Sequence, residues 1–190
     1  GLDYWDMYLI HWPNPKRGLY VEAFQALLDA RDRGLIRSVG VCNFLPEHLD
    51  RVHAETGEYP SVNQIELHPF CQQQALRQVM AAYHIQPMAW APFAEGQGNL
   101  FHHPVLSAIG QAHGKTPAQV VLRWLRQEGI VAIPKSVHPQ RIRENWDIED
   151  FTLSPGELTQ IRALDQNRSW ILDVPNLTEV YRLHNIPVSQ

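Results

Sequence analysis

Short apolar runs alternate with longer amphipathic runs along most of this 190-residue chain, and that alternation restricts the fold more than any other feature. A run of about four to eight apolar residues predicts a buried strand, whereas apolar residues three and four apart predict a helix. Strands separated by helices at this spacing are expected to be parallel. The predicted strands are residues 7–12, 36–42, 62–67, 86–90 and 130–133, and the predicted helices are residues 20–33, 46–57, 72–83, 105–113, 116–128, 138–145 and 154–164.

Proline and small polar residues mark where several of these helices begin. Thr116-Pro117 predicts an N-cap followed by proline in the first turn, and Ser154-Pro155-Gly156-Glu157 predicts a capping box. Residues 91–103 form a long predicted loop. No periodicity is visible after Asp165, so residues 166–190 are interpreted as a C-terminal tail.

Two α/β architectures suit this order of elements, a (β/α)₈ TIM-type barrel and a doubly wound open sheet. No GxGxxG follows the first strand, so the usual phosphate loop of a dinucleotide-binding open sheet is missing. Polar residues also recur where the predicted strands end, and in a barrel those ends converge on one mouth that carries the chemistry. The residues concerned are His11, Asn43, Gln64, Glu66, Lys135 and Ser136.

The number of units is smaller than a barrel requires. About five β/α units are present, whereas a complete barrel has eight in about 250 residues. We therefore expect a single, partial barrel domain over residues 1–190, containing strands four to eight and lacking the N-terminal strands. The chain is then either a fragment of a longer protein or one that a partner chain completes.

Composition excludes several classes of protein. The formal charge of −4, from 16 basic and 20 acidic residues, gives no general attraction to nucleic acid or to an anionic membrane. The two cysteines, Cys42 and Cys71, are too few for a secreted disulfide framework. No signal peptide and no membrane-spanning run is recognised. We expect a cytoplasmic protein that binds a small molecule, contacts neither nucleic acid nor membrane, and is a monomer when full-length.

Four segments, in this order, resemble the aldo-keto reductase family. They are Leu-Asp-Tyr-Trp-Asp-Met-Tyr-Leu-Ile-His-Trp-Pro at 2–13, Gly-Val-Cys-Asn-Phe at 40–44, Val-Asn-Gln-Ile-Glu-Leu-His-Pro at 62–69, and Ile-Pro-Lys-Ser at 133–136 followed by Arg-Ile-Arg-Glu-Asn at 141–145. The resemblance extends to about Asp165. Within the family, Cys42, Trp90 and the Gln-Ile-Glu-Leu-His-Pro run are most similar to the bacterial 2,5-diketo-D-gluconate reductases.

The resemblance implies NADPH-dependent reduction of an aldehyde or keto-sugar to an alcohol, with His11 as a catalytic residue. A histidine at this position would stabilise the negative charge that develops on the carbonyl oxygen. Cys42, Asn43 and Gln64 match the positions that hold the nicotinamide carboxamide, although Cys42 replaces the usual serine. Trp90 matches the aromatic that stacks on the nicotinamide. From the residues alone, Asn43 and Gln64 could instead cap strand ends, and Trp90 could be a core aromatic.

The resemblance also assigns the remainder of the cofactor site. Phe93, Ala94 and Glu95 match the loop that covers the pyrophosphate. Lys135, Ser136 and Arg141 would bind the 2′-phosphate of NADPH, and Val137 joins this group. Glu144 and Asn145 match the adenine contacts and share a helix face with Arg141, although such a run could also be a solvated charged face. Trp12 and Trp170 are candidates for the substrate pocket, together with Ile171.

Part of the family's catalytic set is missing from this sequence, and one histidine pair is not assigned to a metal site. The family's proton-donating tyrosine, its lysine and its aspartate precede the strand that carries His11, and they are absent from these 190 residues. His102-His103 lacks a third ligand at a suitable spacing, so no metal site is predicted. Two other functions stay open: an NADPH-binding sensor or subunit without catalysis, and an unrelated phosphate-binding barrel enzyme such as an isomerase or aldolase.

Overall fold

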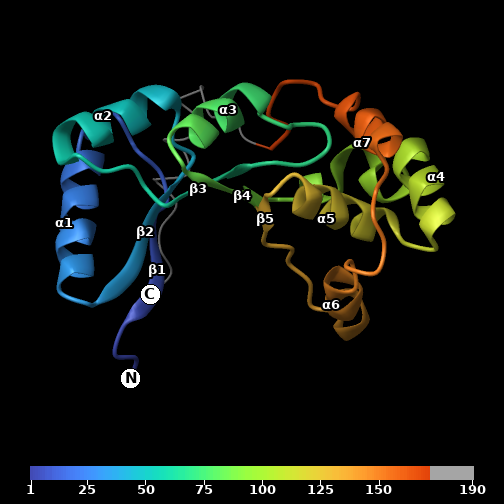
Figure 1. Cartoon of the computed structure of the whole chain (residues 1–190), viewed down its shortest axis with the longest axis horizontal. Helices are drawn as coiled ribbons and strands as arrows, with labels where there is room; N and C mark the ends of the chain where they lie inside the picture. The colour runs from blue at the N-terminus through green and yellow to red at the C-terminus, as the bar shows by residue number, and fades with distance from the viewer. Residues whose placement is uncertain (172–190) are drawn as a thin grey trace. The chain divides into compact units, whose positions relative to one another are not determined.

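A computed structural model describes residues 1–171, which divide into two compact units. The first unit consists of residues 1–65 and 74–87, and the second of residues 66–73 and 88–171. Figure 1 shows the elements of both units along the chain. The expectation of one domain over residues 1–190 stays a prediction, and most of the predicted tail, residues 172–190, lies outside the described residues.

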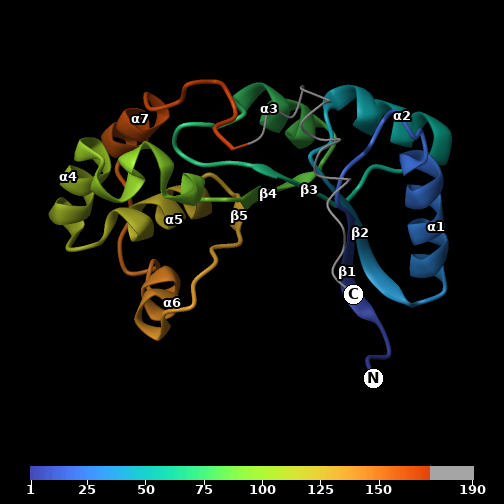
Figure 2. The same ribbon diagram turned by 180° about the vertical axis from the view of Figure 1, so that it is seen from behind.

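The first unit contains three strands that pair in parallel and in chain order. The strand β2 pairs with β1 on one side and with β3 on the other, with Met7 opposite Ser38 and Cys42 opposite Gln64. The helices α1 and α2 contact each other, and α1 also contacts β1 and β2, as Figures 1 and 2 show. The bounds are β1 Trp5–Ile10, α1 Tyr20–Asp32, β2 Ile36–Cys42, α2 Pro46–Thr56, β3 Val62–Glu66 and α3 Gln74–Ala82.

The core of the first unit explains why β2 is its central strand. The last four residues of β2, from Val39 to Cys42, are all buried, as expected for a parallel strand that is covered on both faces. Phe24 and Leu28 of α1 are buried as well. Gly40 allows close packing at this point, because a Cβ there would lie 2.5 Å from Cδ2 of Leu9 and 3.0 Å from the carbonyl oxygen of Val62.

The second unit contains two parallel strands and a group of helices. Met88 of β4 lies opposite Val131 of β5, and Ala89 opposite Ala132. The helix α5 contacts α4, α6 and β5, while α4 also contacts α7 (Figure 2). The bounds are β4 Gln86–Trp90, the 3₁₀ segment η1 Ala94–His102, α4 Pro104–His113, α5 Pro117–Gln127, β5 Val131–Ala132, α6 Pro139–Trp146 and α7 Pro155–Arg162.

The predicted caps are confirmed. The hydroxyl of Thr116 accepts a hydrogen bond from the backbone N–H of Gln119, while the backbone N–H of Thr116 donates to the side chain of Gln119. Ser154 and Glu157 form the same reciprocal pair at the start of α7. Each box satisfies N–H groups that the first helical turn leaves without a partner.

The structure differs from the sequence prediction mainly at element ends. The strand β1 ends at Ile10, so His11 and Trp12 follow the strand instead of completing it. The strand β5 has only two residues, and α3 begins at Gln74. The predicted loop 91–103 contains η1, which is interrupted where residues such as Glu95 and Gly98 have positive φ angles. Among residues 1–171 no helix is both long enough and apolar enough to cross a membrane.

Gly40→Ala tests the close packing of β2. The added methyl group has to displace Leu9 or the backbone of Val62, so we expect the free energy of unfolding to fall by about 1–3 kcal/mol. Urea denaturation followed by circular dichroism measures the change. Gly156→Ala is the matched control, because its Cβ would meet nothing closer than the Ser154 hydroxyl at 4.0 Å. Equal stability of Gly40→Ala and the unmodified chain would contradict the packing argument.

Candidate functional site

Hydrogen bonds join three adjacent strands of the first unit at the predicted nicotinamide contacts. His11 directly follows β1 and is exposed. Its carbonyl oxygen accepts a hydrogen bond of 3.3 Å from Nδ2 of Asn43, which follows β2. The backbone N–H of Asn43 in turn donates to the carbonyl oxygen of Gln64 on β3, at 2.9 Å. Parallel pairing and these two bonds therefore place His11, Asn43 and Gln64 in one row.

The backbone at Asn43 shows why an asparagine suits the end of β2. Asn43 has a φ of 59°, in the left-handed region that asparagine tolerates better than most residues with a side chain. Its side chain is buried and bonded, so the turn out of the strand is held on both sides. The predicted cofactor contact at Asn43 is thus a fixed group and not a mobile side chain.

Asn63 is a residue that the sequence prediction missed. It is fully buried, its Oδ1 accepts a hydrogen bond from the backbone N–H of Phe44 at 3.3 Å, and its Nδ2 donates to the Phe44 carbonyl oxygen at 2.9 Å. Asn63 therefore fixes the segment that carries Cys42 and Asn43. The available signal was an asparagine inside a predicted buried strand, since buried polar groups require partners.

The predicted pyrophosphate loop belongs to the second unit and has an unusual backbone. Ala91, Ala94 and Glu95 all have φ angles between 46° and 52°. Phe93 packs against Phe101 with ring centroids 5.6 Å apart, and Ala94 is buried. Residues with side chains rarely adopt this conformation without outside support, so contacts from elsewhere must hold the loop in shape.

Trp90 stands at the end of β4, immediately before this loop, and is half-buried. Its carbonyl oxygen accepts a hydrogen bond of 3.3 Å from the backbone N–H of Leu67. The strand-end position agrees with the sequence prediction, while the predicted stacking on a nicotinamide stays a prediction.

The predicted phosphate and adenine residues lie on α6 and the segment before it. Lys135, Val137 and Arg141 are exposed, and within residues 1–171 neither Lys135 nor Arg141 forms an ion pair. The hydroxyl of Ser136 accepts a hydrogen bond of 3.2 Å from the backbone N–H of His138. Two cations without a carboxylate partner are suited to bind an anion from solution.

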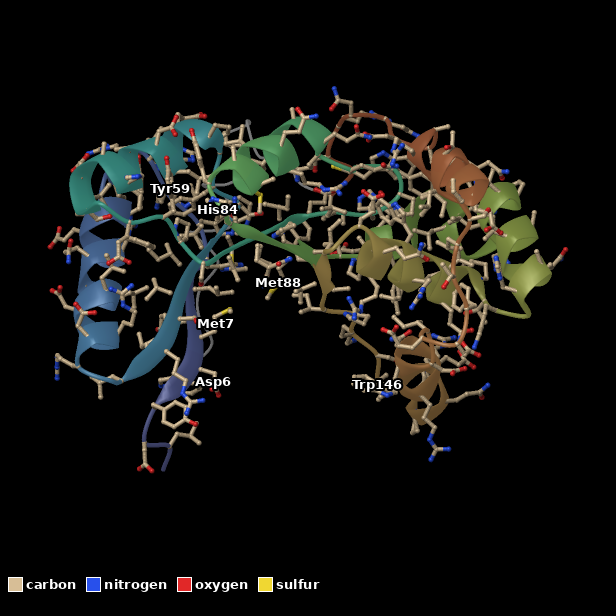
Figure 3. The ribbon with its side chains drawn as sticks, in the orientation of Figure 1. Asp6, Met7, Tyr59, His84, Met88 and Trp146 are labelled. Carbon is tan, nitrogen blue, oxygen red and sulfur yellow. The ribbon has the colours of Figure 1, made fainter. Side chains whose placement is uncertain are left out.

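The C-terminal end of α6 is held by α5 and by Lys115, which precedes α5. The side-chain amide of Gln119 donates to the carbonyl oxygen of Asp147 at 2.8 Å, and Lys115 lies 2.9 Å from the Asp147 carboxylate. Glu144 and Asn145 are half-buried, with Glu144 accepting a hydrogen bond from Gln140. Trp146 at the end of α6 is 87% exposed and projects away from the ribbon in Figure 3.

The two predicted pocket residues fall in different units. Trp12 is half-buried beside His11, with ring centroids 6.1 Å apart. Trp170 stacks on Phe70, with centroids 4.7 Å apart and an interplanar angle of 19°. Ile171 is the last residue described. That all the predicted site residues share one pit stays a prediction.

A sequence model of the Aldo/keto reductase family matches residues 1–166 of this chain. The chain belongs to the aldo/keto reductase family. As a family member it is similar to a methylglyoxal reductase, DkgA, of Yersinia pestis, with 49% identity over 164 residues, which are 86% of this chain and 59% of the relative.

Two solved structures are also similar to this chain. One is a single-residue mutant of Gox0644 in complex with NADPH, with a TM-score of 0.87 and 42% identity over 92% of this chain and 64% of that one. The other is described as a putative 2,5-diketo-D-gluconic acid reductase B, with a TM-score of 0.80 and 30% identity over 90% of this chain and 60% of that one. These similarities confirm the predicted family and a TIM-barrel-like arrangement of β/α units. The chain spans about 60% of the length of the curated relatives it matches.

The two cysteines of this aldo/keto reductase chain are buried and free. Burial raises the pKa of the Cys42 thiol to about 11. Burial, with a smaller contribution from the carboxylates of Glu66 and Asp165, raises the pKa of Cys71 to about 12. Since the thiolate is the reactive form, neither cysteine is set up as a nucleophile.

Thiol titration with Ellman's reagent at pH 8 tests this assignment. A thiol of pKa about 11 is ionised to about one part in a thousand at pH 8, whereas an exposed cysteine of pKa about 8.5 is substantially ionised. We expect both cysteines to react at least about 100-fold more slowly in the folded chain than in guanidinium. The variants Cys42→Ala and Cys71→Ala show which cysteine produces each phase of the labelling reaction. Rapid labelling of either thiol in the folded chain would contradict the assignment.

Proposed function

We propose that this chain supplies the cofactor contacts and one catalytic residue of an enzyme that reduces a small carbonyl compound to an alcohol with NADPH. The observation that carries the proposal is the bonded row of His11 and Asn43, which follow β1 and β2, and Gln64, which lies within β3. A catalytic imidazole and two amide side chains are part of what carbonyl reduction by a nicotinamide requires on the protein side. The related Gox0644 structure with NADPH supports the choice of cofactor.

The first unit would bind the nicotinamide carboxamide. An amide side chain offers both a donor and an acceptor, which matches the donor and acceptor of the carboxamide. Asn43 and Gln64 are the residues assigned to this contact, and the buried Cys42 contributes shape and a weak hydrogen bond where other members have serine. The second unit would contribute Trp90 for stacking and Phe93, Ala94 and Glu95 around the pyrophosphate.

The residues proposed for the 2′-phosphate have the charge and the exposure that binding a phosphate group requires. Lys135 supplies a point charge and Arg141 a planar fork, and both are exposed without an ion-pair partner among residues 1–171. Ser136 and Val137 adjoin them, and Glu144 and Asn145 follow Arg141 along α6 at helix-neighbour spacing. This set would hold a 2′-phosphate and the adenine, which favours NADPH over NADH.

When bound, NADPH supplies the hydride. His11 would hold a proton or hydrogen bond on the substrate oxygen as negative charge develops there. Its exposed position at the end of β1 leaves the ring accessible to a substrate. The resemblance assigns proton donation to a tyrosine assisted by a lysine and an aspartate, and residues 1–190 do not contain that group.

The substrate class is a small aldehyde or keto-sugar. The Yersinia pestis relative is named a methylglyoxal reductase, and one structural neighbour a putative 2,5-diketo-D-gluconic acid reductase B, which supports compact oxygenated carbonyl compounds. Trp12 and Trp170 would shape the pocket. We further propose that the five strands correspond to strands four to eight of an eight-stranded barrel, and that the whole enzyme is a cytoplasmic monomer that engages neither nucleic acid nor membrane.

Removing either cation should weaken NADPH binding selectively. We expect Lys135→Met and Arg141→Ala each to raise the Kd for NADPH by about 10- to 100-fold, because each loses a charge-assisted hydrogen bond to the phosphate. Binding of NADH should change little, since NADH lacks that phosphate. Quenching of tryptophan fluorescence measures both. Arg143→Ala is the control, because Arg143 is exposed on α6 two residues from Arg141 and faces elsewhere.

Equal losses for NADPH and NADH would contradict the assignment of Lys135 and Arg141 to the 2′-phosphate. Inorganic phosphate that competes as well as NADPH would instead favour the phosphate-binding enzyme.

A polypeptide limited to residues 1–190 should bind NADPH without consuming it. The phenol of a proton-donating tyrosine has an ordinary pKa of about 10 and needs neighbouring groups to act at neutral pH, and none of that set is present. Loss of NADPH absorbance with methylglyoxal as substrate is the measurement, and a complete relative such as DkgA is the positive control. Steady turnover well above the buffer rate would contradict the expectation.

A further inference from the structure

We propose that Glu66 is a positioning residue that fastens residues 169–170 and, through the ring of Trp170, sets the shape of η1, so that cofactor affinity depends on it. The inference rests on the proposed function, because it assigns regulation of the same cofactor site. All of the residues concerned belong to the second unit.

Glu66 ends β3 with a carboxylate that has no exposed surface. Oε1 accepts one hydrogen bond of 2.9 Å from Nε2 of His68 and another of 2.9 Å from the backbone N–H of Trp170. Oε2 accepts a hydrogen bond from the hydroxyl of Ser169. Burial by itself would raise the pKa of Glu66, but these donors outweigh it and the pKa is lowered. A buried carboxylate with three donors is therefore tied to the segment 169–170.

His68 is oriented to serve this carboxylate. Its Nδ1 accepts a hydrogen bond of 3.3 Å from the backbone N–H of Phe70, which assigns the ring proton to Nε2, the atom that faces Glu66. The backbones of His68 and Cys71 also exchange two hydrogen bonds, of 3.1 and 3.0 Å. Residues 66–73 thus form a closed, internally bonded loop that can act as a fixed anchor.

The segment after α7 returns to this anchor, as Figure 1 shows. The backbone N–H of Gln166 donates to the carbonyl oxygen of Phe70 at 3.0 Å, and Asp165 accepts a hydrogen bond of 3.1 Å from the backbone N–H of Gln72. Trp170 then stacks on Phe70. The position of the Trp170 ring is consequently fixed by Glu66 at its backbone and by Phe70 at its face.

Gly98 of η1 lies against the edge of the stacked rings of Trp170 and Phe70. A Cβ at Gly98 would overlap the ring, lying 2.6 Å from Cη2 of Trp170 and 2.9 Å from Cε2 of Phe70. Gly98 also has a φ of 61°, which glycine adopts without strain. The glycine lets the backbone of η1 rest directly against Trp170. Since η1 also contains Ala94 and Glu95, the contact at Gly98 lies on the same segment as the loop assigned to the pyrophosphate.

This arrangement makes the anchor and the cofactor thermodynamically linked. The backbone of η1 has positive φ angles at Glu95, Gly96, Gly98 and Asn99, so its shape is decided by what it rests on. If NADPH favours the η1 shape that contacts Trp170, it must also favour the closed segment 169–170, because coupling between two sites is reciprocal. The peptide bond after Arg168, an exposed residue, reports whether that segment is closed.

The test combines limited trypsin digestion with NADPH titration of the full chain. The rate of appearance of fragment 1–168 is measured by mass spectrometry with and without saturating NADPH. We expect NADPH to slow this cleavage at least about fivefold in the unmodified chain. In Glu66→Gln, which preserves size but removes the charge, we expect faster cleavage, a Kd for NADPH raised about five- to fiftyfold, and no slowing by NADPH.

Controls separate this linkage from general destabilisation. Glu157→Gln removes a bonded carboxylate of the second unit at the start of α7, and it should leave cleavage after Arg168 and NADPH affinity unchanged. Gly98→Ala disturbs the same contact from the η1 side without altering Glu66, so it should reproduce both effects even if Glu66→Gln folds poorly.

The outcomes are distinct. If Glu66→Gln and Gly98→Ala are both cleaved at the same rate as the unmodified chain, and both bind NADPH with the same affinity, this inference is overturned. The proposed function is not affected by that result. Absence of NADPH binding to the unmodified chain would overturn the proposed function, and this inference with it. Faster cleavage with unchanged NADPH affinity would reduce Glu66 to a structural residue and would also overturn the inference.

Discussion

Parallel pairing of β2 with both β1 and β3 is the constraint on which the functional part of the first unit depends. Parallel pairing in register brings residues at or near the ends of adjacent strands together in space. His11, Asn43 and Gln64 are 32 and 21 residues apart in the chain, yet two hydrogen bonds join them. Gly40 allows the strands to pack this closely, because a larger residue would have to displace Leu9 or the backbone of Val62.

The main constraint in the second unit is different, because an irregular loop has to be held in one shape. A loop with repeated positive φ angles does not hold itself by regular backbone hydrogen bonds, so it needs supports from outside. Trp170 and Phe70 provide an apolar support, and Glu66 fixes Trp170 through its backbone. A buried carboxylate with three donors suits this task, since the loss of any donor leaves a buried charge with fewer hydrogen bonds, which is costly. Part of this support, from Phe70 and from the Glu66 carboxylate, therefore comes from residues that were not assigned to the cofactor or the substrate pocket.

Much of the fold follows from local sequence. The strand β2, the strand β4 and the start of α5 agree with the prediction because apolar runs, proline and capping residues act over a few neighbours. The errors lie where distant contacts decide. The strand β1 stops at Ile10, since pairing with β2 ends at Val41, and β5 is limited to the two residues that pair with β4. The role of His68 could not be predicted from the sequence, because its partner Glu66 gains importance only through Ser169 and Trp170.

The sequence by itself determined the family, the order of parallel strands and helices, and the residue types of the candidate site, because these depend on short motifs and on hydrophobic periodicity. Only the tertiary structure decided that Asn63 braces the segment after β2, that Lys135 and Arg141 have no ion-pair partner within residues 1–171, and that a carboxylate at position 66 binds a segment 103 residues later. The physical reason is that a hydrogen bond depends on the distance between two atoms in space. The number of residues between them in the sequence does not reveal that distance.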